Sequence, residues 1–570
     1  MYHIRRYIVM GLIVISLCYI KFNIATTSYL DVHPFRGGSL KSETFNPLIA
    51  ASVNENILTV SIDGNDYNNS IYDIFMDDNL NIMVPVNILT DSLNCSVHLY
   101  PDNTLLLEKR DEEVALSLGQ NTITVNGETE NVEDAMIQKN NSLYVSLEDV
   151  TSNLQYNYQW DIETNGATAY DNSGETSILP AKYDLREKGR TSTVKNQGST
   201  GTCWAFASLA ALESDLLPME AYEYSPDHMS RRNSFTKISG DSGEYTMAMA
   251  YLLAWQGPVY EAEDPFGDGV SPEGLSPEKH IQEIQLINGK DYEKIKEAVF
   301  KYGGVETSLY STIRSNYDSG AYYNDETYGY CYIGTEKPNH EVVIVGWDDN
   351  YSKDNFTTSV EGDGAFICQN SWGDSFGENG YFYVSYYDTN IGSHNVIYTG
   401  VEATDNYDRI YQSDLCGWVG QVGYNRSDIY AANVYTALEN EYVKACGFYA
   451  TGQNTTYSVY FVNNFTDTSS LNTEVKVAEG TLKNAGYYTI DFDEPKAVTG
   501  GEKYAVVIVI DTPEATNPMA VEYAGDEATA DAIIDDGEGY ISSNGSYWES
   551  TEQTNGCNLC LKAYSSREVQ

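Results

Sequence analysis

Basic residues are scarce in this sequence. Lysine and arginine together number 33, against 83 aspartates and glutamates, so the formal net charge of the 570 residues is −50. A surface of that sign repels the phosphates of nucleic acids and the headgroups of anionic membranes, and we expect neither as a partner. The acidic excess suits a protein that stays soluble outside the cell, and it says nothing about chemistry.

Cysteine is also sparse, with nine residues scattered at positions 18, 95, 203, 331, 368, 416, 446, 557 and 560. Small scaffolds held by disulfides carry dense, paired cysteines, so a disulfide framework is not expected. Cys557 and Cys560 form a single CxxC motif, without the second pair or the nearby histidines that a structural metal site needs. We predict no metal and no cofactor, and interpret this motif as strand-edge cysteines or one local disulfide.

Long apolar runs are limited to one, from Ile8 to Ile20, preceded by Arg5 and Arg6. A positive start followed by a short apolar segment is typical of a secretory leader, and the run is too short to span a bilayer comfortably. No clear small-residue cleavage site follows. Residues 1–28 are therefore interpreted as a signal peptide or an uncleaved N-terminal anchor, which places the protein outside the cell or at its surface.

The composition supports several folded domains. Hydrophobic residues make up 42% of the chain, which is enough to form buried cores. A chain of 570 residues is too long for a single core, so we expect about three domains. Residues 56–170 alternate apolar and polar side chains in the manner of strands. Within them, residues 83–100 align with residues 144–160, and each copy reads as strand, short helix, strand.

This repeat resembles the N-terminal domain of bacterial copper amine oxidases, which also occurs as a stalk on unrelated secreted enzymes. The resemblance implies a non-catalytic module over residues 56–170. It implies no copper, because His98 is the single histidine of that region. Residues 171–178 form a polar linker to the next domain.

The central segment contains a candidate nucleophile. Residues 196–202 form a loop rich in glycine and serine, and Cys203 then opens an amphipathic helix. The unpaired N–H groups and the positive end of the dipole at a helix N-terminus favour a thiolate, which is the attacking form of cysteine. A buried structural cysteine is the alternative, but it does not account for the glycines that let a substrate backbone come close.

A cysteine nucleophile needs a base from elsewhere in the chain. Of the seven histidines, His340 stands apart, because it enters a strongly apolar segment in KPNHEVVIVGWDDN. His228 and His280 lie in polar or proline-rich stretches. In isolation a histidine beside an apolar strand is more often structural, and the spacing from Cys203 is what favours catalysis here.

QGSTGTCWAF around Cys203 resembles the nucleophile motif of the papain family, and NSWG at residues 370–373 resembles its asparagine motif. The resemblance covers residues 179–399 and implies an α+β, two-lobed papain-like fold. It implies that Gln197 helps to form the oxyanion hole and that Asn370 orients His340. Trp372 would cover that hydrogen bond.

Gly243 matches a cleft position that pairs with the substrate backbone, and Ser242 stands where a glycine is common. Other departures concern the disulfide beside the nucleophile, because Thr200 and Gly240 replace its cysteines. The interval between His340 and Asn370 is longer than usual, and no typical inhibitory propeptide precedes Leu179. In the extra length, Asp348, Asn350, Ser352 and Asp354 alternate as in a calcium loop, but we interpret them as a solvated acidic turn.

Residues 406–565 are again rich in strands, such as YSVYFV (457–462), GYYTIDF (486–492) and KYAVVIVI (503–510). They resemble the lectin-like β-sandwich that follows the protease domain in a group of bacterial papain relatives. Lectin-like describes a fold there, so contact with carbohydrate or cell wall stays open.

The sequence thus predicts a cysteine endopeptidase that hydrolyses peptide bonds through Cys203, His340, Asn370 and Gln197. The expected partner is a protein or peptide substrate, and we expect a monomer. Two alternatives remain: an acyl transferase or transpeptidase that uses the same thioester, and a non-catalytic surface adhesion protein.

Overall fold

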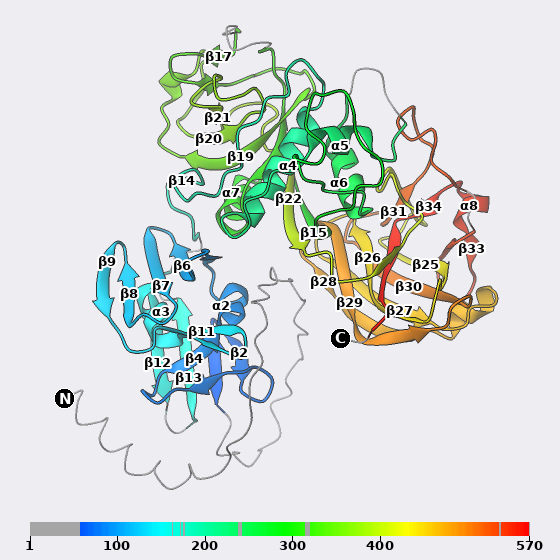
Figure 1. The fold of residues 1–570 in the computed structure, drawn as a ribbon, viewed down its shortest axis with the longest axis horizontal. Coiled ribbons are helices and arrows are strands. Elements are labelled where there is room, and N and C mark those ends of the chain that lie inside the picture. The colour runs from blue at the N-terminus through cyan, green and yellow to red at the C-terminus, as the bar shows by residue number, and fades with distance from the viewer. Residues whose placement is uncertain are drawn as a thin grey trace. The chain divides into compact units, whose positions relative to one another are not determined.

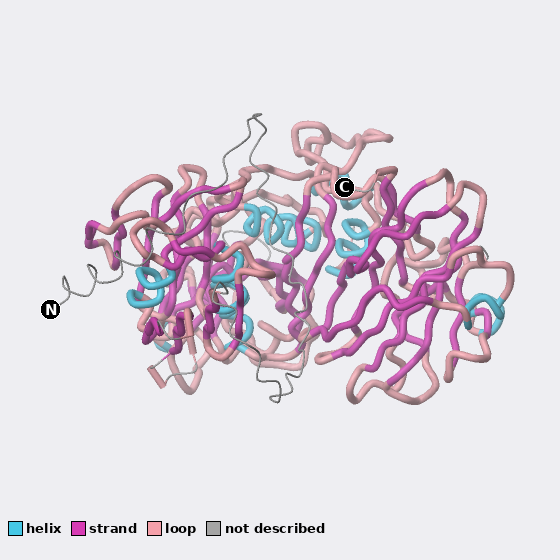
Figure 2. The backbone as a smooth tube through the Cα atoms, turned by 90° about the horizontal axis from the view of Figure 1, so that it is seen from below, coloured by secondary structure: helices cyan, strands magenta, loops and turns pink. Residues whose placement is uncertain are grey.

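A computed structural model describes residues 58–161, 164–171, 173–174, 177–236, 242–313, 320–534 and 537–568 (Figures 1 and 2). Strands predominate throughout these residues (Figure 2). The predicted leader at residues 1–28 lies outside them. Within the described ranges, no helix is long and apolar enough to cross a membrane.

The N-terminal region contains three small sheets. Their strands are β12 (Tyr156–Asp161), β13 (Gly166–Asp171), β1 (Thr59–Ile62) and β2 (Asn65–Asn68); β10 (Met136–Lys139), β11 (Ser142–Ser146), β4 (Ile82–Pro85) and β3 (Phe75–Met76); and β5 (Ser96–Leu99), β6 (Thr104–Lys109), β7 (Glu112–Ser117), β8 (Thr122–Val125) and β9 (Glu128–Asn131).

The two copies of the repeat have the same local structure. In the first, β4 leads into helix α2 (Val86–Ser92) and then β5, and in the second, β11 leads into α3 (Leu147–Asn153) and then β12. The copies meet where β4 and β11 pair antiparallel. The alternating pattern therefore predicted these strands and helices correctly.

The central region packs helices against one face of a sheet. Helix α4 (Cys203–Leu216) lies against β19 (His340–Asp348) and β22 (His394–Glu402) on one side, and against α5 (Pro226–Arg231) and α6 (Tyr245–Leu253) on the other (Figure 1). Most residues of α4 are buried, because the helix packs within the apolar core of this region. This arrangement places Cys203 at one end of a fixed helix, against the strand that begins with His340.

Among the described residues that sheet has 13 strands, and it runs through both the central and the C-terminal regions. Its remaining central strands are β14 (Lys182–Asp184), β15 (His280–Asn288), β16 (Val305–Leu309), β17 (Tyr323–Asn324), β18 (Gly329–Tyr330), β20 (Ala365–Gln369) and β21 (Tyr381–Ser385), and helix α7 (Tyr292–Lys301) packs on it. Its C-terminal strands are β29 (Ala485–Val498), β26 (Glu441–Ala450), β35 (Leu561–Ser566) and β23 (Arg409–Tyr411).

The C-terminal region adds two further sheets. One contains β28 (Val475–Leu482), β27 (Thr455–Val462), β30 (Lys503–Asp511), β25 (Asp428–Thr436), β32 (Gly539–Ser542) and β33 (Glu549–Ser550), and the other contains β24 (Gly420–Val422), β31 (Met519–Glu522) and β34 (Asn558–Leu559). A short helix, α8 (Thr551–Thr554), follows β33. Buried side chains from the long sheet, such as Phe448, share one core with others from β27 and β30, as in a β-sandwich. The three runs interpreted as strands at 457–462, 486–492 and 503–510 lie in β27, β29 and β30.

The central and C-terminal regions join through paired strands. Strand β15 pairs with β22 on one side and with β29 on the other, over Glu283 to Leu286. At this junction Gly486 has a φ of +145°, and a Cβ added there would lie 2.1 Å from the backbone oxygen of Ile284. Only glycine allows β29 to approach β15 this closely. The fold is therefore α+β, as predicted, with a junction that the strand pattern did not reveal.

Contacts also connect the N-terminal and central regions. Arg190 is almost completely buried, and its Nη1 lies 2.8 Å from His98 Nε2, which in turn lies 3.1 Å from the Phe300 carbonyl oxygen. Nearby, Lys188 forms a 2.7 Å ion pair with Glu108. Burial and the neighbouring Arg190 lower the pKa of His98 well below its usual value, so this contact holds a neutral imidazole.

Candidate active site

Cys203 is the first residue of α4, and its side chain is only partly exposed. Thr202 precedes it without a side-chain cap, so the first N–H groups of the helix are left for the thiol or a ligand. Burial is the largest influence on the thiol and raises the pKa of Cys203 to about 11. Hydrogen bonding from the backbone of Glu341 and Trp204 acts in the opposite direction.

His340 begins β19 and is buried. Its Nε2 lies 2.8 Å from Asn370 Oδ1, so Nε2–H donates to the amide oxygen and leaves Nδ1 for a second partner. The Trp372 ring stacks on the imidazole, with centroids 4.7 Å apart and planes 24° apart. Asn370 and Trp372 therefore fix the plane of the ring.

Burial lowers the pKa of His340 to about 4, and the hydrogen bond that His340 donates to Asn370 offsets this shift only in part. Burial thus disfavours the thiolate and the imidazolium when each is formed alone. Transfer of the thiol proton to the imidazole creates both charges together, and their attraction offsets the cost of desolvation.

Gln197 lies on the loop before α4, and Ser371 holds it in place. The Ser371 hydroxyl donates to Gln197 Oε1 at 2.5 Å, and the backbone N–H of Gln197 donates to the Ser371 carbonyl at 2.8 Å. Gln197 Nε2 donates one hydrogen to the Thr200 carbonyl at 2.7 Å. An amide nitrogen carries two hydrogens, so the second is available to a substrate oxygen.

Thr200 stands at the position for which the resemblance implied a cysteine. Its hydroxyl donates to the Gln197 carbonyl at 2.8 Å and lies 2.6 Å from the Thr202 hydroxyl. These hydrogen bonds tie the loop before α4 internally. The other replaced position, Gly240, lies outside the described residues.

Gly243 lies close to the nucleophile's helix. A Cβ at this position would come within 2.6 Å of the Trp204 ring and 2.9 Å of the Met247 sulfur. Glycine is therefore needed for the loop to lie this close to α4. Ser242 precedes it with an exposed side chain.

The two candidate metal motifs have other structures. Within the described ranges, no group of three or more histidine, cysteine or acidic side chains is placed to hold a metal ion. Asp348 and Ser352 cap local backbone N–H groups, and a short 3-10 helix occupies Lys353–Asn355. Cys557 and Cys560 are buried free thiols beside β34, so the local disulfide is not formed.

Sequence reasoning missed Ser371, which reaches Gln197, and two buried carboxylates, Glu306 and Glu341. The position of Ser371 within NSWG gave no hint of its partner. The glutamates, by contrast, interrupt the apolar segments GGVETSLY and HEVVIVG. A charged residue inside a buried strand is uncommon enough to have served as a signal.

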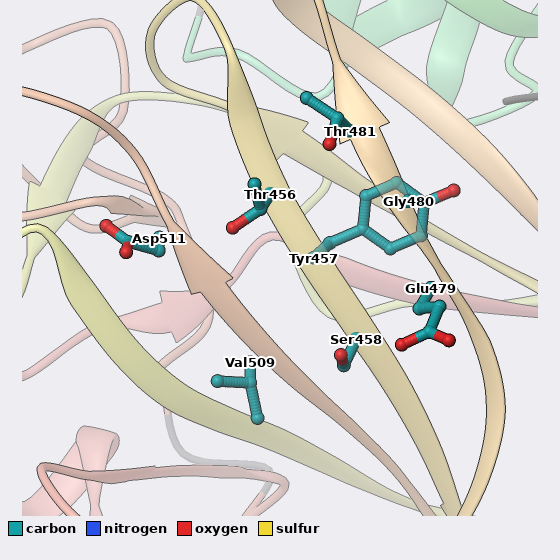
Figure 3. Close-up of a pocket in the computed structure, with 8 residues that line it drawn as sticks. All are labelled: Thr456, Tyr457, Ser458, Glu479, Gly480, Thr481, Val509 and Asp511. Atoms are coloured by element: carbon teal, nitrogen blue, oxygen red, sulfur yellow. The ribbon is translucent and has the colours of Figure 1, made fainter. Parts of the chain in front are cut away.

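A hollow of about 340 Å³ lies on the C-terminal region, at an open face of β27, β28 and β30 (Figure 3). Thr456 stands directly between Asp511 and Thr481 in the register, and Ser458 stands between Val509 and Glu479. The lining contains hydroxyl and carboxylate groups but no cysteine or histidine. It can bind a polar ligand, but it lacks a nucleophile of the type found at Cys203.

Family models match three parts of the chain. Residues 61–168 match the copper amine oxidase N-terminal domain, residues 179–400 match the papain family of cysteine proteases, and residues 410–565 match a lectin-like domain.

Among curated proteins, mouse cathepsin K is 28% identical over 213 residues, which are 36% of this chain and 59% of that protein. Mouse pro-cathepsin H is 28% identical over 260 residues, which are 43% of this chain and 74% of that protein. The ragweed cysteine protease Amb a 11.0101 from Ambrosia artemisiifolia is 30% identical over 217 residues, or 36% of this chain and 50% of that protein. The chain thus spans less than two thirds of some of these relatives.

Among solved structures, the clostridial cysteine protease Cwp84 after propeptide cleavage is 27% identical, with a TM-score of 0.61. The match covers 68% of this chain and 99% of that one. A structure of the cysteine protease and lectin-like domains of Cwp84, described as a surface layer associated protein of Clostridium difficile, gives a TM-score of 0.60 at 27% identity. It covers 68% of this chain and 89% of that one.

Proposed function

Because residues 179–400 match the papain family of cysteine proteases, we propose that this chain is a cysteine endopeptidase in which Cys203 is the nucleophile and His340 the base. The observation that carries this proposal is the orientation of His340. Its Nε2 is committed to Asn370 beneath Trp372, which leaves Nδ1 for a proton from the thiol. A ring fixed in this way is what a general base needs.

The reaction begins when the thiol proton of Cys203 passes to His340 Nδ1 and the thiolate attacks the scissile carbonyl carbon. The carbonyl oxygen gains negative charge, which the free amide hydrogen of Gln197 and the backbone N–H of Cys203 stabilise. His340 then gives its proton to the leaving amine as the C–N bond breaks, and a thioester remains. Water, deprotonated by His340, cleaves the thioester and restores the thiol.

The proposal is tested with Cys203→Ala and an epoxide that alkylates thiols. Hydrolysis of a fluorogenic peptide and labelling by the epoxide are both expected to be lost in the variant. Cys203 is partly exposed, whereas the other described cysteines are buried, so the reagent is expected to label those cysteines far less. Turnover retained by the alanine variant would overturn the assignment. Product analysis with an added amine distinguishes hydrolysis from acyl transfer.

We further propose that the enzyme acts at the cell surface on protein substrates. Support comes from the basic and apolar N-terminal segment at residues 1–28 and from the likeness to a surface layer associated protease. The strongly negative net charge fits an extracellular environment. Fractionation of cells that produce the protein, followed by immunoblotting of culture medium and envelope, tests this location.

The C-terminal domain is proposed to contact carbohydrate through the hollow in Figure 3. Thr456 and Ser458 at its centre are small, so a sugar ring can approach the sheet. The Asp511 carboxylate is exposed and, among the described residues, has no hydrogen-bond or ion-pair partner. Carboxylates and hydroxyls are suitable partners for sugar hydroxyls.

A glycan array, followed by titration of the best binder, tests this contact. Asp511→Ala is expected to weaken binding, whereas Cys203→Ala is expected to leave it unchanged. Equal binding by all three proteins would exclude this hollow as the binding site.

A further inference from the structure

Two buried carboxylates lie in the sheet beside the candidate active site. Glu341 directly follows His340 on β19 and is 9% exposed, and Glu306 on β16 is 1% exposed. In the antiparallel register Ser308 stands opposite Glu341, while Glu306 lies two residues before Ser308. Since side chains of a strand alternate between faces, Glu306, Ser308 and Glu341 share one face of the sheet.

The hydrogen-bond partners of these carboxylates are neutral. The Ser308 hydroxyl lies 2.9 Å from both Glu341 oxygens, and the Ser208 hydroxyl of α4 lies 2.8 Å from both Glu306 oxygens. The Tyr398 hydroxyl also donates to Glu306 Oε2, at 3.3 Å. Across the described ranges, neither carboxylate forms an ion pair with a basic side chain, whereas buried Glu213 pairs with Lys195 at 2.7 Å. A buried charge without a counter-ion is costly, so a cation that reached this pair would stabilise its charged form, and the chain itself supplies none within the described ranges.

The pair also lies close to the candidate nucleophile. The backbone of Glu341 hydrogen-bonds to the Cys203 sulfur, and the charges of both glutamates act on the thiol. Tyr245, which begins α6, lies near the same carboxylates, because the charges of Glu244, Glu341 and Glu306 help burial to raise its pKa. A side chain entering between β19 and the start of α6 would therefore meet carboxylates immediately beside the reacting sulfur.

The pKa values of both carboxylates are raised. Burial, and the charge of Glu341, raise the pKa of Glu306 well above its usual value. Burial is also the main reason why the pKa of Glu341 is raised to about 7. The Ser308 hydrogen bond lowers it, and the charge of the exposed Glu244 raises it. At pH 7 Glu341 is therefore about half ionised, and an approaching cation would stabilise its charged form.

We propose that Glu341, supported by Glu306, forms a substrate subsite that selects a lysine or arginine side chain close to the scissile bond. The proposal rests on the assignment of Cys203 and His340 as the reacting groups. Arginine and lysine are the side chains whose cationic heads reach several bonds beyond the backbone, and a guanidinium can engage a carboxylate through two parallel hydrogen bonds. Substrates without a cation would leave the buried charge uncompensated.

Cleavage of a diverse peptide library is the first test. The expected result is enrichment of lysine and arginine at one fixed position within three residues of the cleaved bond. The second test compares two peptides that carry arginine or its neutral isostere citrulline at that position. The ratio of kcat/KM for arginine over citrulline is expected to be about 10 to 100 in the natural protein, from the strength of a charge-assisted hydrogen bond.

Glu341→Gln keeps the size of the side chain and its ability to accept from Ser308 but removes the charge. The arginine-to-citrulline ratio is expected to fall by about 10- to 100-fold in this variant, whereas Glu361→Gln, which removes a charge from an exposed position, is expected to keep it. A ratio unchanged by Glu341→Gln, or a library without basic enrichment near the cleaved bond, would show that the pair is a neutral structural feature and overturn the proposal.

Two further measurements separate this outcome from other failures. If Glu341→Gln does not fold, the pH dependence of the ratio in the natural protein still decides, because the ratio must rise as pH increases through about 7. If the inference is wrong but the active site is correct, peptides are still cleaved without basic preference and Cys203 is still labelled by the epoxide. If no peptide is cleaved and Cys203 is not labelled, the proposed function itself fails.

Discussion

Ser371 allows a direct test of how the oxyanion-binding amide is held. Its hydroxyl donates to Gln197 Oε1 at 2.5 Å, and both side chains are buried. In Ser371→Ala the Gln197 oxygen loses this partner, and the amide retains only the hydrogen bond from Nε2 to Thr200. The amide can then rotate, so its second hydrogen points less consistently at the substrate oxygen.

The size of the effect follows from that single contact. A neutral buried hydrogen bond contributes about 0.5–1.5 kcal/mol, which corresponds to a decrease in kcat of roughly 2- to 12-fold. Complete loss of the donor in Gln197→Ala is expected to cost about 100- to 1000-fold, which sets the upper limit for Ser371. KM is expected to change little, because the amide acts mainly on charge that develops in the transition state.

The assay compares kcat and KM of the natural protein, Ser371→Ala, Gln197→Ala and the double variant on one fluorogenic peptide. If Ser371 acts by orienting Gln197, its replacement has almost no further effect once Gln197 is alanine. Ser371→Thr, which keeps the hydroxyl, should recover most of the rate. An equal loss of kcat in both backgrounds would refute the reasoning, because Ser371 would then act by another route.

Three other predictions concern His340, Glu341 and the shared sheet. Asn370→Ala is expected to lower kcat by about 10- to 100-fold, since the imidazole loses its orienting partner but keeps the Trp372 stack; a loss below threefold would contradict this role. The raised pKa of Glu341, about 7 in the folded protein against 4.5 normally, stabilises the protein below pH 4.5, and that contribution is lost as pH rises through 7. The melting temperature of Glu341→Gln should therefore fall less between pH 5 and pH 8 than that of the natural protein, and parallel curves would argue against the shift. Gly486→Ala is expected to lower the free energy of unfolding by about 2–5 kcal/mol, because its Cβ would meet the Ile284 backbone and its φ is unfavourable; an unchanged denaturant midpoint would contradict the close approach.

Much of the fold could be predicted because its signals are local. Alternation of apolar and polar residues predicted the strands of the repeat, and apolar runs predicted β27, β29 and β30. The candidate site was predicted because Cys203, His340 and Asn370 each lie within a short characteristic motif. The structure brings His340, Asn370 and Trp372 together and places Cys203 at a helix start. Their catalytic roles stay predictions until the variants are measured.

The features that could not be predicted depend on contacts between distant segments. Nothing local to Ile284 or Gly486 reveals that β15 and β29 pair, since strand pairing is set by the packed sheet. The hydrogen bond between Ser371 and Gln197 likewise joins two loops whose approach is fixed by the tertiary fold. The acidic character of this region arises in the same way, because only the register of β16 and β19 brings Glu306 and Glu341 onto one face of the sheet near each other.

The pairing of β15 with β29 also bears on how the C-terminal domain would influence cleavage. When two domains are joined by a flexible linker, a ligand bound to one domain reaches the site on the other at an effective concentration that depends on the linker. Hydrogen-bonded strands instead restrict the rotation of one domain against the other, so a carbohydrate bound near Asp511 would limit which peptide bonds can reach Cys203. Loosening this junction with Gly486→Ala should therefore slow the cleavage of a protein substrate attached to isolated cell walls more than the cleavage of a small soluble peptide. Equal loss on both substrates, measured at a temperature at which the variant remains folded, would show that the shared sheet serves stability alone.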